Sequence, residues 1–225
     1  MSQGIRIPLE NARKGVQWLW KLWGLADLDA SVVGSVRRQK LDVGDIEIIA
    51  PLPAGADEPR LPEAHDKLFQ AINRTVTNPW QDDRVGLFTP TPPAVPRMEN
   101  PVATAVSGLK PGFKTLCLVV RPRPEIEVPV QIYRFTAENR GWVTLMRTGP
   151  REFGMWFLSE WKRQYGIPAA EQACRDNHLV DGRGKVVAVR NEGEAFEACG
   201  LRFVAPELRE MHMKNVNRAQ QEAMR

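Results

Sequence analysis

Residues 34–53 read GSVRRQKLDVGDIEIIAPLP, and this segment brings a Gly-Ser pair, two arginines and two carboxylates close together in the chain. From Asp45 to Ala50 the residues first alternate between polar and apolar and then become wholly apolar, which is typical of a strand that enters a core. Side chains two residues apart on a strand point to the same face. We therefore predict a strand that places the carboxylates of Asp45 and Glu47 side by side.

Carboxylates paired in this way are suited to binding a divalent cation. Mg²⁺ prefers hard oxygen ligands and commonly uses one or two carboxylates together with substrate phosphates. The Gly34-Ser35 pair offers backbone N–H groups and a hydroxyl to an anion, and Arg37 and Arg38 add donors that match a phosphate. An Asp-x-Glu pair alone is a weak signal, because solvated carboxylates are common at strand edges. The combination is more specific and predicts a metal site beside a phosphate-binding site.

This segment resembles the nucleotidyltransferase signature of the family X DNA polymerases, the polymerase beta family. Residues 6–23, RIPLENARKGVQWLWKLW, are similar to the helix that precedes the signature in that family. Gly141-Trp142 and the MRTGP motif at 146–150 resemble the segment beside the incoming nucleotide, in the form found in small phage and bacterial members. Residues 192–210, EGEAFEACGLRFVAPELRE, resemble the terminal thumb segment. The matches follow the family's order and cover nearly the whole chain.

The resemblance implies an α+β fold and an enzymatic activity. Residues 1–137 would form a nucleotidyltransferase palm with a mixed or antiparallel sheet, and residues 138–225 a mostly helical, thumb-like nucleotide-binding part. The N-terminal lyase and helix-hairpin-helix domains of larger relatives would be absent. The implied reaction is the transfer of a nucleoside monophosphate from an NTP or dNTP to the 3′-hydroxyl of a DNA primer or another nucleic-acid end. The implied cofactors are two Mg²⁺ or Mn²⁺ ions.

The resemblance also implies roles for individual residues. Asp45 and Glu47 would bind the metals, and with Gln131 they occupy the three catalytic positions. Arg6 lies where the family often has an arginine that contacts phosphate. The implied phosphate- and nucleotide-binding residues are Gly34, Ser35, Arg38, Gly44, Thr148 and Gly149.

Gln131 departs from the family pattern. The third carboxylate of the family is expected in a V-D-I or V-D-L sequence, and the matching segment here is Val-Gln-Ile at 130–132. A glutamine can offer a carbonyl oxygen to a metal, but it carries no charge and cannot accept the proton of a primer hydroxyl. Glu47 also replaces the usual second aspartate. A shifted register of the later strand would bring Glu125 or Glu127 into the third position.

Three interpretations therefore stay open. The first is an active template-directed or terminal nucleotidyltransferase, which the retained signature favours. The second is a catalytically silenced member that binds a nucleotide or a nucleic acid, which Gln131 favours. The third is an unrelated α+β domain with a chance match, which the ordered set of motifs disfavours. We expect enzyme-type chemistry.

Composition and charge agree with a globular protein. The chain has 225 residues, of which 43% are hydrophobic and 26% charged, and this excludes a wholly disordered chain, a collagen and a coiled-coil rod. A net charge of +4 does not identify a nucleic-acid binder by itself. Arg37, Arg38 and Lys40 nevertheless cluster beside the predicted site, as phosphate contacts require. A second basic cluster, which fits a solvated surface equally well, comprises Arg147, Arg151, Lys162 and Arg163.

The remaining composition bears on compartment and assembly. The three cysteines and three histidines lack metal-ligand spacing, and a sparse, odd set of cysteines fits a reducing compartment. No apolar run reaches the roughly 18 residues of a membrane helix, and no apolar signal core begins the chain. We expect a cytoplasmic monomer that does not bind membranes.

Periodicity predicts the other elements. We expect helices at residues 9–23, 64–76, 153–165, 169–177 and 192–199, and a polar, partly helical tail from residue 207. We expect strands at residues 30–33, 115–120, 128–135 and 185–189. We expect irregular, proline-rich loops at residues 51–62 and 89–112.

Overall fold

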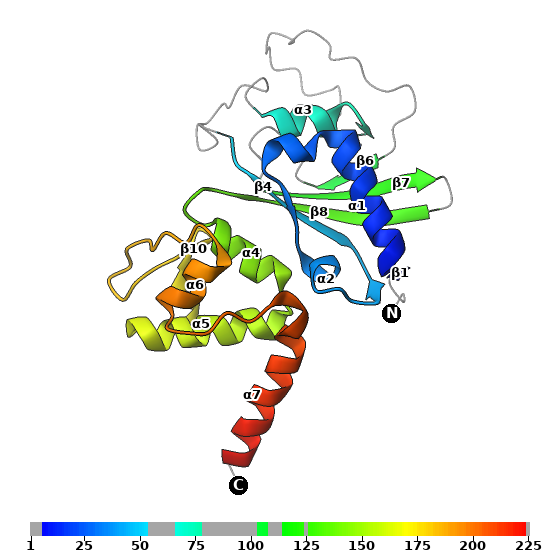
Figure 1. Cartoon of the computed structure of the whole chain (residues 1–225). Helices are drawn as coiled ribbons and strands as arrows, with labels where there is room; N and C mark the ends of the chain where they lie inside the picture. The colour runs from blue at the N-terminus through cyan, green and yellow to red at the C-terminus, as the bar shows by residue number, and fades with distance from the viewer. Residues whose placement is uncertain (1–5, 54–65, 78–102, 108–113, 124–125, 224–225) are drawn as a thin grey trace.

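A six-stranded sheet dominates the first half of the chain (Figure 1). Its strand order is β2-β4-β8-β7-β6-β5, with β4 parallel to β8 and β5 parallel to β6, while the other neighbours are antiparallel. The expected mixed sheet is therefore confirmed. The strands are β2 Ser31–Val32, β4 Ile46–Pro51, β5 Val76–Thr77, β6 Ala103–Ser107, β7 Thr115–Arg123 and β8 Ile126–Phe135. The computed structural model describes residues 6–53, 66–77, 103–107, 114–123 and 126–223.

Two helices cover one face of this sheet. α1 (Leu9–Trp23) buries Leu19 and Trp23 against the sheet, and α3 (Lys67–Asn73) adds a second apolar surface to the same core. Gly24 ends α1 in the left-handed conformation, at φ +60°, where a residue without a Cβ has no steric penalty. The short strand β1 (Ile7–Pro8), just before α1, pairs with β3 (Asp42–Val43).

The opposite face of the sheet carries the predicted site. Ile46, Ile48 and Ile132 point into the core beneath α1. Glu47 and Gln131 lie between these residues in their strands, so their side chains point to the other face. The parallel register of β4 and β8 makes Glu47 and Gln131 direct neighbours.

The second half is mainly helical and lies beside the sheet (Figure 1). Its core is rich in aromatic side chains, with Trp142, Phe153, Phe157, Trp161 and Phe196 all buried. No helix of the described residues is long and apolar enough to cross a membrane. The elements are α4 Arg140–Thr148, α5 Arg151–Tyr165, β9 Cys174–Arg175, β10 His178–Leu179, α6 Glu192–Ala198 and α7 Arg209–Ala223.

Gly141 allows α4 to lie directly against the chain that leads into α6. A Cβ at Gly141 would overlap the backbone carbonyl of Asn191, and the Gly141 N–H donates to the Val189 carbonyl at 2.8 Å. We expect Gly141→Ala to lower the free energy of unfolding by about 2–3 kcal/mol, because the overlapping atoms belong to the backbone and cannot rotate away. Urea denaturation measures this change.

A matched control for this substitution is Gly15→Ala. Gly15 lies within α1, and a Cβ there would meet only the terminal methyl of Ile46 at 3.2 Å. Alanine is the better helix former by about 1 kcal/mol, so this variant should be as stable as the wild type or more stable. Equal stability of both variants would contradict the close packing of α4 on the Asn191 backbone.

Most predicted elements are confirmed, and two are wrong. The helix predicted at 169–177 is instead a 3₁₀ turn followed by the β9–β10 hairpin, because Asp176 and Asn177 adopt positive φ angles that end a helix. The strand predicted at 185–189 is reduced to one β-bridge between Val186 and Val180.

Other boundaries moved. The helix predicted at 64–76 is the shorter α3, after which Val76 begins β5. The proline-rich segment predicted as irregular at 89–112 includes β6. The rest of that segment lies outside the described residues, and so does most of the predicted loop at 51–62. α4 was not predicted.

Candidate active site

Asp45, Glu47 and Gln131 come together where β4 and β8 begin to pair. The Gln131 amide donates from Nε2 to Asp45 Oδ2 at 3.0 Å, and its Oε1 accepts a hydrogen bond from the Tyr133 hydroxyl. Glu47 is the register partner of Gln131. Asp45 and Gln131 are therefore in contact, and Glu47 is the strand neighbour of Gln131.

The observed register also decides between candidates for the third position. Glu127 lies four residues before Gln131 and is exposed, and its carboxylate pairs with Arg121 at 2.6 Å. The shifted register that would bring Glu127 to the site is therefore wrong. Glu125 lies outside the described residues. The observed register places Gln131 beside Glu47.

Gly34 makes room for Glu47. Gly34 has φ +67°, and a Cβ there would overlap Oε2 of Glu47. The Gly34-Ser35 pair begins a four-residue helix, α2 (Gly34–Arg37). The Ser35 Oγ atom is buried and has no hydrogen-bond partner among the described residues. An unsatisfied buried hydroxyl beside a carboxylate pair is suited to a polar ligand.

Burial disfavours the ionised form of both the Asp45 and the Glu47 carboxyl groups. Desolvation raises the pKa of Asp45, against the opposing effects of Arg38 and Arg6. Desolvation and the neighbouring Asp45 charge raise the pKa of Glu47 to about 7, although Arg147 and Arg38 partly offset this. Two desolvated carboxylates that repel each other electrostatically favour a bound proton or a bound cation.

Glu47 should make stability fall as pH rises. Its carboxyl ionises near pH 4.5 in the unfolded chain and near pH 7 in the folded protein, so the folded state binds more protons between these values. The free energy of unfolding therefore decreases across this window, by an amount on the order of 2–3 kcal/mol. We expect Glu47→Gln to flatten this part of the profile and to be more stable than the wild type at pH 8.

Denaturant titrations in EDTA at pH 5 and pH 8 test this expectation. Glu10→Gln is the control, since Glu10 is exposed on α1 and pairs with Lys14. An unchanged slope in Glu47→Gln would show that Glu47 does not carry the proton.

The predicted phosphate-binding residues lie beside the carboxylates and join the two halves of the chain. The Arg38 guanidinium donates to the Thr148 carbonyl and also lies against Gly149, which has φ +58°. The Thr148 hydroxyl accepts from Arg37 at 2.7 Å, so its side chain is engaged within the protein. Gly44 lies close to the Arg6 guanidinium. The structure thus brings all of the predicted residues to one region.

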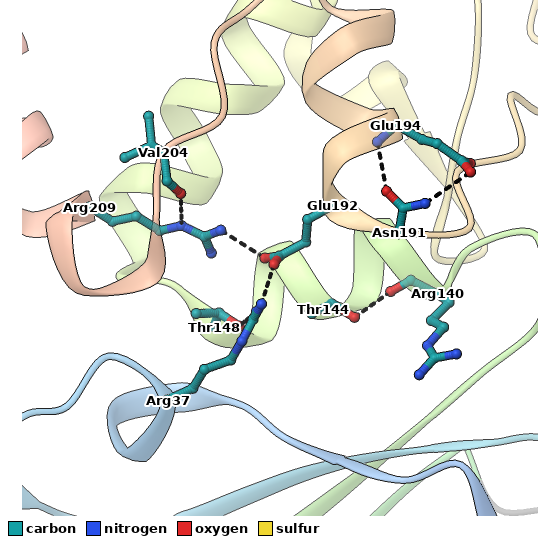
Figure 2. Close-up of polar contacts among 9 residues, drawn as sticks. All are labelled: Arg37, Arg140, Thr144, Thr148, Asn191, Glu192, Glu194, Val204 and Arg209. Carbon is teal, nitrogen blue, oxygen red and sulfur yellow. Dashed lines mark hydrogen bonds and ion pairs between the residues drawn. The ribbon is translucent and has the colours of Figure 1, made fainter.

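A buried carboxylate, which we did not predict, links the two halves more deeply. Figure 2 shows Glu192 between two guanidiniums, with Arg37 at 2.5 Å and Arg209 at 2.8 Å. Both Glu192 and Arg209 are almost fully buried, and Arg209 also donates to the Val204 carbonyl. Such a pair holds its elements in fixed positions, because removing one partner leaves an unpaired buried charge. Their one signal in the sequence is the resemblance of residues 192–210 to a thumb segment.

Tyr133 lies beside the candidate site and was missed, whereas Arg147, which also lies there, was predicted only as part of the MRTGP motif and of the second basic cluster. The Arg147 guanidinium lies 3.8 Å from the centre of the Tyr133 ring. Its charge lowers the pKa of Glu47, which places a positive charge near the carboxylates. Tyr133 could have been found, because it lies two residues after Gln131 on the same face of a strand.

The donor set fits one divalent cation better than two. Asp45 and Glu47 supply oxygen ligands with a shared excess of negative charge. The Gln131 amide turns its N–H toward Asp45 and its oxygen toward Tyr133, so Gln131 presents a hydrogen-bond donor to the carboxylates and adds no third negative charge to them. Within the described residues, no group of three or more His, Cys, Asp or Glu side chains could hold a metal.

Comparison with known proteins assigns no family. The sequence matches no protein-family model, and no curated protein matches it.

Proposed function

We propose that this chain is a metal-dependent nucleotidyltransferase of the DNA polymerase X type, with a palm-like first half and a thumb-like second half. The observation that carries the proposal is the contact of Asp45 with Gln131 at paired strands, with Glu47 beside them. This set lies next to Gly34, where a Cβ would overlap the Glu47 side chain. It also lies next to the basic segment of Arg37, Arg38 and Lys40, whose charges are suited to phosphates.

The residues have separate roles in this proposal. Asp45 and Glu47 would hold Mg²⁺ or Mn²⁺, which when bound neutralises phosphate charge and polarises the reacting oxygens. Arg38 and the unpartnered Ser35 hydroxyl would bind phosphate oxygens. The absence of a Cβ at Gly44 would let the triphosphate approach the backbone. The acceptor would be the 3′-hydroxyl of a DNA or RNA end.

A second candidate function is a silenced member that binds nucleotide without transferring it. The Gln131 amide favours this candidate, because it donates to Asp45 and cannot accept a proton from a primer hydroxyl. The two candidates share the nucleotide site and differ only in turnover.

Incorporation of labelled nucleotide into DNA and RNA primers, in Mg²⁺ and in Mn²⁺, tests the proposal. Extension of either primer supports the enzyme. No extension, together with a higher melting temperature in the presence of ATP or dATP and Mg²⁺, supports the silenced member. If the protein shows no primer extension and also no thermal shift, both candidate functions are contradicted.

A further inference from the structure

Two cations of the basic segment share one carboxylate from the C-terminal helix. Glu210, in the first turn of α7, pairs with Lys40 at 2.5 Å and lies 3.5 Å from the Nε atom of Arg38. The Glu210 side chain is 34% exposed, so solvent reaches it. The contact brings α7 to the segment that precedes the carboxylate strand.

The position of Glu210 is set by its neighbour. Arg209 is fully buried and is held by the Glu192 carboxylate at 2.8 Å and by the Val204 carbonyl at 3.2 Å (Figure 2). The backbone at the start of α7 is therefore anchored, while the side chain of Glu210, held by Lys40 and Arg38, is partly exposed to solvent. Replacement of the Glu210 carboxylate by another anion at Arg38 and Lys40 would need only a change in the side-chain conformation of Glu210.

Glu210 satisfies Arg38 incompletely. The Nε atom of Arg38 is buried and makes no hydrogen bond within the described residues, although Glu210 lies 3.5 Å away. A phosphate oxygen that approached this nitrogen more closely would complete its hydrogen bonding. The Lys40 side chain is 44% exposed, and its ammonium group could pair with phosphate as readily as with carboxylate.

We propose that Glu210 is an internal competitor for the terminal phosphates of a nucleoside triphosphate, and that Lys40 joins Arg38 in binding those phosphates once Glu210 has turned away. This inference rests on the proposed nucleotide site. It makes Glu210 a residue that sets selectivity by phosphate number. A triphosphate carries the terminal phosphates that would displace the carboxylate, whereas a monophosphate lacks them and leaves the existing ion pairs in place.

Calorimetric titration of the full chain with ATP and dATP, and with AMP and dAMP, tests the inference in Mg²⁺. We expect Glu210→Gln to bind the triphosphates about 5–10-fold more tightly, as loss of a partly exposed ion-pair competitor implies. The monophosphates should bind as they do to the wild type. The matched control is Glu207→Gln, since Glu207 is exposed and makes no ion pair within the described residues.

A second variant examines Lys40 directly. Lys40→Gln should weaken triphosphate binding several-fold and leave monophosphate binding unchanged. If the wild type binds triphosphate and Glu210→Gln binds it no more tightly, Glu210 is not a competitor, and the proposed function still stands. An equal gain in Glu207→Gln would also overturn it, by assigning the effect to net charge. If neither the wild type nor any variant binds triphosphate, both the inference and the proposed nucleotide site are overturned.

Discussion

Replacing Gln131 with aspartate is expected to raise the rate of nucleotide incorporation by about 10²–10⁴-fold, the usual contribution of a positioned general base. The side chain of Gln131 already lies in hydrogen-bond contact with Asp45 and beside Glu47, so the new carboxylate would face the other two. It would supply an anionic metal ligand and a group able to accept a proton. The same change should destabilise the metal-free protein, because three desolvated carboxylates repel one another.

Primer extension in Mg²⁺ and Mn²⁺ measures the gain, and Gln131→Asn provides the matched control. Asparagine has nearly the shape of aspartate, so it tests the shorter side chain without the charge. We expect Gln131→Asn to be no faster than the wild type. Equal rates for the Asp and Asn variants would show that a missing carboxylate does not limit catalysis. A wild type that is already fast would remove the case for a silenced site.

Local sequence patterns predicted the elements whose ends are marked by residues such as proline or glycine. α1 has the predicted bounds of residues 9–23, because Pro8 precedes an amphipathic stripe and Gly24 follows it. β4 and β8 were predicted from alternation and β-branched residues. α4 was missed, because its first turn contains a glycine whose role, contact with the Asn191 backbone, is visible only in the folded chain.

The candidate site divides in the same way. Asp45, Glu47 and Arg38 belong to one short segment, so spacing and resemblance were enough to predict them. Glu192 and Glu210 pair with the basic segment from more than 150 positions away, and Arg209 binds Glu192 from the same part of the chain. Such ion pairs leave no periodic trace in a sequence. The orientation of the Gln131 amide depends on Tyr133 and Asp45 together, so no single motif indicates it.

The missed contacts change how the basic cluster is interpreted. As a sequence, Arg37, Arg38 and Lys40 look like three free cations available to a nucleic acid. In the structure Arg37 is bound to Glu192, and Arg38 and Lys40 share Glu210. Part of this positive charge therefore joins the two halves of the protein. The charge left for a ligand depends on exchange at Glu210, since Glu192 is buried.

Asp45→Asn should abolish the response of the protein to divalent cations. We expect the wild type to gain several degrees in melting temperature with Mn²⁺ relative to EDTA, because a cation offsets the repulsion of Asp45 and Glu47. The variant should lose that gain. In EDTA it should be at least as stable as the wild type, because a desolvated carboxylate has been replaced by a neutral amide of the same size. Incorporation by the Gln131→Asp enzyme should fall at least about 10³-fold when Asp45→Asn is added, since residues that act as a unit are not additive.

The matched control for Asp45→Asn is Asp42→Asn. Asp42 lies three residues earlier in β3 and is exposed, so its amide variant removes the same charge without touching the site. We expect it to keep both the Mn²⁺ response and the incorporation rate. A Mn²⁺ response that survives in Asp45→Asn would place the cation elsewhere, and the metal role of Asp45 and Glu47 would then be wrong. A response lost in both variants would instead indicate nonspecific attraction of cations to the acidic surface, because only a site built on Asp45 can separate the two substitutions.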